Sequence, residues 1–435
     1  MNNDTGKLLR TIARDLEQVV IPNVAVPNVQ TLVGMMKSLL EREAGHIEHS
    51  GSAESDAALA SDADLPSLIA AAETALASSL GGETTSRDSA FAESGAGRRS
   101  AQNSEDVRLS AIDSEQVLAY LQSLPDWAWV EQAKVTQTAG GFSKDTFIVT
   151  VTGAGREDGM VLRRDQAFRP LLTSVSDEKP VLESLSALGF PAPRPLWIET
   201  DPSIFGASVI AMTLASGSAD AEQWAQHEER RDRIVRSSAR LLAELHAIPV
   251  ENAGSEGAGV PGSTGASPVD FALDLAAYWD RIAPKPNPLM EAVLSWLEKN
   301  APASFERRCI VHGDYGLHNL LVDGEDIQAV LDWEFWHIGD AREDLAYIKP
   351  FMEQIGGLAT FLAAYQEAGG VSSDAASEGF YTVLGSVRVA MGCYALQNGF
   401  KNAVPTIDSK MIYVGRSFAD RFLIDAAKIA TGAGQ

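Results

Sequence analysis

Three polar residues in the C-terminal half have the types and the spacing to carry out phosphoryl transfer. Asp314 closes the triplet His312-Gly313-Asp314, Asn319 follows it by five residues, and Asp332 follows Asn319 by thirteen. Such transfer needs a carboxylate that orients the attacking hydroxyl and takes its proton, and oxygen ligands that hold Mg²⁺ against the phosphates. Asp314 fits the first role, and Asn319 with Asp332 fits the second.

The chain between Asn319 and Asp332 predicts a β-hairpin. Two short apolar runs, Leu320–Val322 and Ile327–Leu331, flank the turn sequence Asp323-Gly324-Glu325-Asp326. Apolar runs of this length around an Asp-Gly turn are typical of hairpins. A hairpin returns the chain to its starting point, so we expect the polar residues before and after it to meet in space.

Each of these polar residues, taken alone, also has a structural explanation. Asp and Asn are common turn residues, and we expect His312 to brace its loop by hydrogen bonds rather than to touch substrate. His318 and His337 are expected to serve local structure, because no Cys or His partner stands at metal-ligand spacing. Four polar positions at the required spacing together favour the catalytic interpretation.

The segments HGDYGLHNLL and VLDWEFWHIGDAREDLAYI closely resemble the aminoglycoside phosphotransferase and choline kinase-like family. They resemble in particular the phosphotransferase domains that animals carry fused to acyl-CoA dehydrogenases. The resemblance implies an α+β, bilobed protein kinase-like fold with a β-rich N-lobe and a helical C-lobe, and ATP with Mg²⁺ in the cleft. It also implies that the catalytic and metal loops are supported by His312, Glu334, Asp340 and Asp344.

A Gly-rich turn between two expected strands is a candidate phosphate loop. The run Ala139-Gly140-Gly141-Phe142-Ser143-Lys144 joins apolar stretches on both sides. Glycines let backbone N–H groups approach phosphates closely, although Gly-Gly is also common in ordinary hairpins. The run resembles the family's Gly-Gly-x-Ser-Asn loop, with Lys144 in place of Asn. We therefore expect Gly140, Gly141 and Ser143 to bind nucleotide.

The next expected strand places Arg163 where kinases have the lysine that holds the phosphates. Arg is permanently charged and can bind phosphate bidentately, and the resemblance implies that Arg163 is the phosphate clamp. Its acidic partner on the following helix is expected to be Glu178, with Glu183 as the alternative. The resemblance also implies a hinge in which Met212 and Leu214 present backbone groups to adenine.

Composition bounds the function classes open to the chain. The net charge of −24 argues against a nucleic-acid partner, which needs a basic face. Cys309 and Cys393 are too few for a disulfide framework and are consistent with a reducing cytoplasm. The chain has no run of about eighteen apolar residues, and its first residues lack a signal peptide's apolar core, so we expect no membrane span and a cytoplasmic location.

Helical periodicity predicts an all-α module before the kinase-like lobes. Apolar stripes recur at helical spacing over 5–20, 28–46 and 65–80. We expect a helical module over 1–80, a flexible Gly/Ser-rich linker over 81–112, an N-lobe over 113–215 and a C-lobe over 216–435. A Gly-rich loop over 251–268 is either a lid or a tolerated insertion. A docking or homodimerisation role for the module is a hypothesis.

The acceptor is the least constrained part of the prediction. The resemblance favours transfer of the γ-phosphate of ATP, or of another nucleoside triphosphate, to a hydroxyl of a small molecule. A hydroxyacyl-CoA or related catabolic hydroxy compound is the leading expectation. An aminoglycoside or choline-type kinase is the alternative, and a catalytically silent ATP-binding regulator is the alternative of another class.

Overall fold

The computed structural model describes residues 65–80, 109, 111–138, 144–166, 173–254, 266–282, 287–401 and 409–432. Its strands are β1 Gln132–Gln137, β2 Lys144–Gly153, β3 Arg156–Asp165, β4 Pro195–Glu199, β5 Val209–Thr213, β6 Arg308–Val311, β7 Leu320–Asp323, β8 Asp326–Val330 and β9 His337–Asp340. Its α-helices are α3 Leu65–Leu80, α4 Ser114–Ser123, α5 Val175–Leu188, α6 Pro202–Phe205, α7 Glu222–Ala225, α8 Glu228–Ala247, α9 Pro268–Ile282, α10 Pro288–Asn300, α11 Ala341–Gln354, α12 Leu358–Glu367, α13 Ala375–Lys401 and α14 Ser409–Ala430. Short 3-10 helices are η3 Pro125–Trp127, η4 Val250–Ala253 and η5 Leu317–Asn319.

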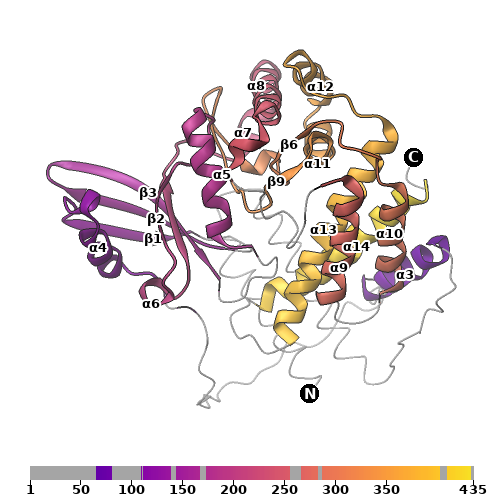
Figure 1. Ribbon diagram of the computed structural model, residues 1–435, viewed down its shortest axis with the longest axis horizontal. Helices are drawn as coiled ribbons and strands as arrows, with labels where there is room; N and C mark the ends of the chain where they lie inside the picture. The colour runs from indigo at the N-terminus through magenta and orange to yellow at the C-terminus, as the bar shows by residue number, and fades with distance from the viewer. Residues whose placement is uncertain are drawn as a thin grey trace, which may run out of the picture.

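The N-lobe is an antiparallel sheet in the order β1-β2-β3-β5-β4. Along β2, Phe147, Val149 and Val151 alternate with more exposed residues and are buried, as expected for a strand with one face in a core. Their cluster includes Val117 and Leu121 of α4. The sheet and α4 project from one side of the molecule (Figure 1), and the β-rich N-lobe is confirmed.

Helix α5 lies between the sheet and the C-lobe helices (Figure 1). A capping box of Ser174 and Asp177 begins it, and Gly189 at φ 76° ends it. Its buried face, with Leu182 and Leu185, belongs to the same apolar cluster as Ile210 of β5. The helix is therefore fixed on the sheet, and this packing sets where its polar residues meet β3.

The chain that leaves β5 contacts the catalytic half of the molecule directly. Ser218 and Val322 of β7 exchange backbone hydrogen bonds of 2.9 and 3.0 Å. Gly217 just before them has φ 110°, and a Cβ there would lie 2.8 Å from the Val322 carbonyl oxygen. The crossing between the lobes thus requires glycine and aligns the hinge with the hairpin.

The C-lobe is helical around two short strand pairs. The predicted hairpin is confirmed as β7 and β8, and β6 pairs antiparallel with β9, with Val311 opposite His337. The segment that joins β8 to β9 carries two tryptophans, Trp333 and Trp336, which are buried in the core. A second apolar cluster unites α9, α10, α13 and α14. The α+β, bilobed architecture is confirmed.

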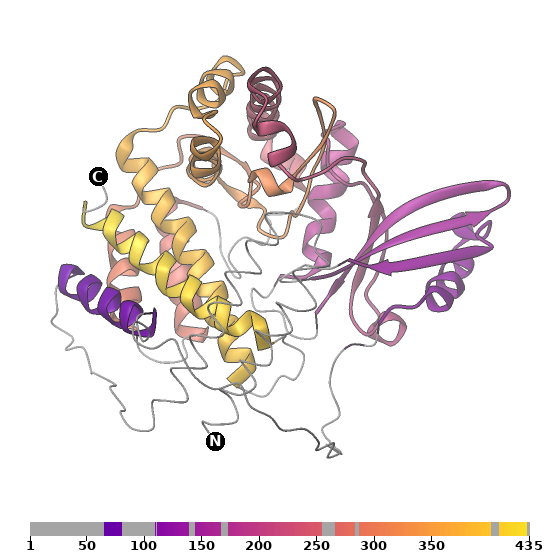
Figure 2. The ribbon, with the colours of Figure 1, turned by 180° about the vertical axis from the view of Figure 1, so that it is seen from behind.

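Helix α3 packs on the C-lobe, beside α10 and α14 (Figures 1 and 2). Leu68 and Ile69 are buried in the cluster of those helices, and Glu73 pairs with Lys428 at 2.6 Å. The helices expected over 5–20 and 28–46 lie outside the described residues. No helix in the described part of the chain is long and apolar enough to cross a membrane.

Candidate active site

The loop after β6 brings Asp314 and Asn319 together. Asn319 donates from Nδ2 to the Asp314 carboxylate at 2.8 Å and to the Asp314 carbonyl at 2.9 Å. The turn η5 between them folds Asn319 back over the loop. With Nδ2 used in this way, Oδ1 is the atom that Asn319 can offer to a cation.

His312 joins this loop to the far end of the hairpin. Its Nδ1 accepts from the backbone N–H of Asp314 at 3.1 Å, so its Nε2 carries the proton and donates to the Leu331 carbonyl at 2.9 Å. The ring is fully buried. The residue before Asp332 is thereby tied to the Asp314 loop, which brings the polar residues on the two sides of the hairpin close together.

Asp344 of α11 supports the same loop from beneath. Its two carboxylate oxygens accept from the backbone N–H groups of His312 and Gly313, both at 2.8 Å. His246 of α8 also bonds to it at 3.1 Å, and the other nitrogen of His246 bonds to Tyr365 at 2.7 Å. Burial raises the pKa of Asp344, but the bonds from His246 and His312 outweigh it and leave the pKa below its usual value.

The contacts of His246 and Tyr365 could not be found from sequence. His246 follows the apolar residues Leu241, Leu242 and Leu245 in the sequence, and the structure buries it against Asp344. Asp340, by contrast, caps α11 and bonds to Arg342 and to the backbone N–H of Glu306. Its contacts fix the end of β9 rather than the Asp314 loop.

Asp332 and Arg163 meet across the two lobes. Arg163 donates from Nη2 to Asp332 Oδ1 at 2.7 Å and from Nη1 to Glu178 at 2.8 Å. Asp332 has a left-handed backbone with φ 63°, a conformation that costs free energy, and its carboxylate meets Arg163 of the N-lobe. Burial raises the pKa of Asp332, but the Arg163 guanidinium holds it below the usual value. Glu183, the alternative partner, pairs instead with Lys179 on the surface.

Glu178 is a buried carboxyl at the junction of the lobes. Its side chain is 1% exposed, and its Oε1 has no hydrogen-bond partner among the described residues. Burial raises its pKa to about 7, even though the Arg163 charge acts in the opposite direction. The Arg163 guanidinium is shared with Asp332, so it compensates Glu178 only in part.

The side of Asp314 away from Asn319 carries residues that sequence reasoning did not assign to the site. His318 Nε2 lies 3.5 Å from Asp314 Oδ1, and its ring packs against Phe351 of α11 at 5.4 Å. Burial and the neighbouring Asp314 charge raise the pKa of Tyr347, so this hydroxyl stays protonated. Arg388 of α13 donates to the Gly313 carbonyl at 3.5 Å. These residues come from η5, α11 and α13, so no single sequence spacing links them.

The remaining expected nucleotide contacts fall into two groups. Gly140, Gly141 and Ser143 lie outside the described residues. Met212 is buried at the end of β5, and Leu214 follows it with an exposed side chain that lies over Gly159. The structure thus places the hinge residues at the junction of the lobes.

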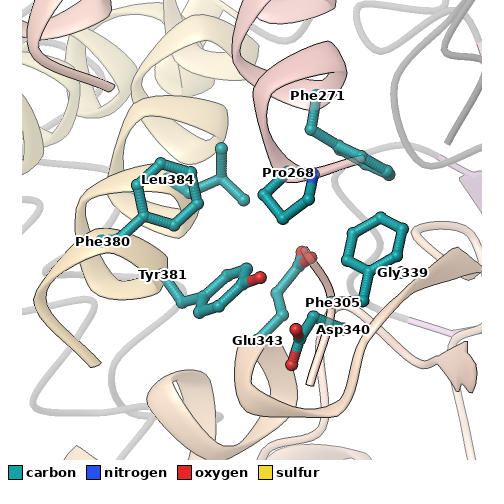
Figure 3. Close-up of a pocket in the computed structure, with 9 residues that line it drawn as sticks. All are labelled: Pro268, Phe271, Phe305, Gly339, Asp340, Glu343, Phe380, Tyr381 and Leu384. Atoms are coloured by element: carbon teal, nitrogen blue, oxygen red, sulfur yellow. The ribbon is translucent and has the colours of Figure 1, made fainter. Parts of the chain in front are cut away.

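A separate crevice lies between α9, α11 and α13 (Figure 3). Its walls include Phe271, Phe380 and Tyr381, with Asp340 and Glu343 below them. Both carboxylates are engaged, Asp340 with Arg342 and Glu343 with His337 and Arg388. The crevice has no room for a water molecule, so it is a packing gap rather than a substrate site.

The oxygen donors near Asp314 suit Mg²⁺ better than a metal ion that is coordinated by protein side chains alone. Within the described residues, no group of three or more His, Cys, Asp or Glu could hold a metal. Mg²⁺ usually takes one or two protein oxygens and fills its shell with water and phosphate oxygens. Asn319 Oδ1 and the partly exposed Asp332 carboxylate provide such a pair.

The phosphotransferase enzyme family matches residues 134–380, more than half of the chain. The chain belongs to this family. The match covers most of the N-lobe sheet, the catalytic loop and the C-lobe up to the start of α13. The expectation of a small-molecule phosphotransferase is therefore confirmed at the level of the family.

Curated relatives match about half of the chain. The probable acyl-CoA dehydrogenase IBR3 of Arabidopsis thaliana is 31% identical over 229 residues, which are 50% of this chain and 28% of the relative. Acyl-CoA dehydrogenase family member 11 of Rattus norvegicus is 29% identical over 253 residues, 55% of this chain and 31% of the relative. The match spans less than a third of the length of either relative.

Solved structures share the fold. A Ralstonia eutropha protein provisionally assigned as an aminoglycoside phosphotransferase aligns with a TM-score of 0.54 and 19% identity, over 73% of this chain and 98% of that one. The aminoglycoside phosphotransferase APH(4)-Ia aligns with a TM-score of 0.50 and 18% identity, over 72% and 98%. At these identities the likeness concerns the fold alone.

Proposed function

We propose that this phosphotransferase moves the γ-phosphate of ATP to a hydroxyl of a small molecule, in a reaction that depends on Mg²⁺. The observation that carries the proposal is the convergence of Asp314, Asn319 and Asp332 around the base of one hairpin. Arg163 faces them from the N-lobe, 2.7 Å from Asp332. Phosphoryl transfer relies on positioning and charge compensation, and this cluster offers both.

Each residue has a role that follows from its contacts. Asp314 orients the acceptor hydroxyl and takes its proton, while the Asn319 amide holds the carboxylate at 2.8 Å. Asn319 Oδ1 and Asp332 would hold Mg²⁺, which supplies charge compensation on the phosphates when bound. Arg163 clamps the phosphates, and Glu178 fixes the orientation of its guanidinium.

The remaining nucleotide contacts belong to the proposal as expectations. Backbone groups of Gly140, Gly141 and Ser143 would surround the phosphates. Met212 and Leu214 would face the adenine at the hinge. His312, Glu334 and Asp344 would support the catalytic and metal loops, whereas the contacts of Asp340 support the end of β9.

For the acceptor we propose a hydroxyacyl-CoA or a related catabolic hydroxy compound. The support is that the relatives that match about half of this chain carry the names of acyl-CoA dehydrogenases. A hydroxylated acyl compound is the class of molecule that connects a hydroxyl-directed kinase with such an enzyme. The dehydrogenase activity itself is not carried over, because the matched region is a minor part of each relative.

The test is ATP consumption with Mg²⁺ across hydroxyacyl-CoAs, free hydroxy acids, aminoglycosides and amino alcohols, with wild type and Asp314→Asn side by side. We expect a hydroxyacyl compound to drive turnover in the wild type. We also expect Asp314→Asn to lower kcat by about 10²–10⁴-fold with unchanged nucleotide affinity. Turnover of aminoglycosides or amino alcohols alone would overturn the acceptor class. Nucleotide binding without any turnover would favour a regulator.

A further inference from the structure

Lys144, the first residue of β2, is a buried cation at the junction of the lobes. Its side chain is 2% exposed. The ammonium donates to the Thr173 carbonyl at 2.9 Å and lies 3.5 Å from Asp165 and 3.7 Å from Glu334 Oε2. A buried ammonium is costly unless oxygen atoms surround it. The oxygen atoms around the Lys144 ammonium come from β3, from the residue before the α5 cap and from the C-lobe.

Glu334 lies two residues after Asp332, and its side chain is 7% exposed. The segment from Asp332 to Trp336 contacts the N-lobe at three points. Asp332 meets Arg163, Glu334 meets Lys144, and the Trp336 indole N–H donates to the Asp177 carbonyl of α5 at 2.9 Å. We call the segment from Asp332 to Trp336 the metal loop, because Asp332 is proposed to bind Mg²⁺. Two ionic contacts and one hydrogen bond thus join it to the N-lobe.

The first of these contacts has to change when nucleotide and Mg²⁺ bind. Asp332 would then direct its carboxylate to the ion, and the guanidinium of Arg163 would turn to the phosphates. The other two contacts involve no residue proposed to bind metal or phosphate. They can keep the loop in place while Asp332 exchanges its partner.

We propose, on the basis of the function proposed above, that Lys144 and Glu334 form a positioning pair for the metal loop. Glu334 acts through Lys144 rather than as a ligand of the metal. A divalent ion on Glu334 would lie close to a buried ammonium that Thr173 holds in place. Like charges repel strongly at such distances away from bulk water.

The experiment is a double-mutant cycle of Lys144→Met and Glu334→Gln in the full chain. Thermal unfolding is measured without ligand, and calorimetry gives AMP-PNP affinity with and without Mg²⁺. Each single change leaves a buried charge without this partner, so we expect each to lower Tm by about 5 °C or more. The double variant should lose clearly less than the sum of the two. The matched control is Lys179→Met, which removes the cation of a surface pair with Glu183.

Calorimetry gives the factor by which Mg²⁺ increases the affinity for AMP-PNP. We expect this factor to be about tenfold smaller in each single variant than in wild type. In Lys144→Arg it should stay close to the wild-type value. If the Tm loss of the double variant equals the sum of the two single losses, Lys144 and Glu334 do not act as a pair. The metal-ligand alternative predicts that Glu334→Gln abolishes the Mg²⁺ effect while Lys144→Met preserves or enhances it, and this result would also refute the proposal. If wild type binds no AMP-PNP, the proposed function fails, and the ligand-free cycle still decides the pair.

Discussion

The guanidinium of Arg163 is bonded to the carboxylate of Asp332 at 2.7 Å, across the boundary between the lobes. The residue proposed to bind the phosphates therefore holds the residue proposed to bind the metal. Glu178 bonds to the other arm of the same guanidinium at 2.8 Å. One forked cation thus organises two carboxylates.

This geometry predicts that lysine cannot replace Arg163. A lysine ammonium keeps the charge but cannot reach both carboxylates with a rigid fork. We expect Arg163→Lys to weaken AMP-PNP binding in the presence of Mg²⁺ by about tenfold, measured by calorimetry. Arg156→Lys, on the exposed end of the same strand, is the matched control and should bind as wild type does. Equal AMP-PNP affinities for Arg163→Lys and wild type would contradict the proposed role of Arg163 in binding the phosphates.

The raised pKa of Glu178 predicts a dependence of stability on pH. The carboxyl ionises at about 4.5 when unfolded and at about 7 in the folded protein. Between these values the unfolded chain loses the proton first, so the stability that Glu178 contributes falls as pH rises and is lost above about 7. Glu178→Gln stays neutral throughout. From pH 5 to 8, its free energy of unfolding should improve relative to wild type by up to about 3 kcal/mol.

The measurement is denaturant unfolding of both proteins over that pH range. The matched control is Glu183→Gln. Glu183 lies five residues further along α5 and its side chain is 55% exposed, so the free energy of unfolding of this variant should change with pH as that of wild type does. A constant difference between Glu178→Gln and wild type would mean that the buried carboxyl is already ionised at pH 5.

Much of the site could be predicted because its information is local. The hairpin follows from apolar runs around Asp323-Gly324, and it accounts for the closeness of Asp314, Asn319 and Asp332. The choice of Glu178 over Glu183 as the partner of Arg163 could be expected only from the resemblance. The structure supports it because α5 turns Glu178 toward β3 and Glu183 toward solvent.

The unpredicted contacts join residues that are far apart in sequence. His246 bonds to Asp344 across 98 residues, and Trp336 bonds to Asp177 across 159. Such pairs depend on how α8, α11 and α5 pack, and helical periodicity defines only which face of each helix is apolar. The placement of α3 on the C-lobe was missed for the same reason, since its apolar stripe fits many partners.

The backbone of the catalytic loop predicts that Gly313 cannot be replaced. Gly313 has φ 78°, and a Cβ there would lie 2.6 Å from the Phe335 carbonyl oxygen and 3.0 Å from Arg388. We expect Gly313→Ala to cost about 1–3 kcal/mol in strain and to lower kcat at least tenfold, since the loop that holds Asp314 must shift. Unfolding and steady-state kinetics measure the two effects.

Gly324 provides the matched control for this substitution. It also has a positive φ, 61°, but a Cβ there meets nothing within 4 Å. Gly324→Ala should cost only about 1 kcal/mol and leave kcat unchanged. A similar kcat for both variants would show that the crowding at Gly313 is irrelevant to catalysis.

The packing of α3 predicts that this N-terminal helix stabilises the C-lobe. Leu68 and Ile69 are 4% and 7% exposed within the cluster that unites α9, α10, α13 and α14. We expect Leu68→Ala and Ile69→Ala each to lower the free energy of unfolding by about 2–4 kcal/mol, measured by denaturant unfolding. Ala70→Ser, at an exposed position of the same helix, is the control and should have little effect. AMP-PNP affinity should stay unchanged in all three, because α3 carries none of the residues proposed to bind nucleotide. Wild-type stability in both core variants would show that α3 contributes nothing to the fold of the C-lobe.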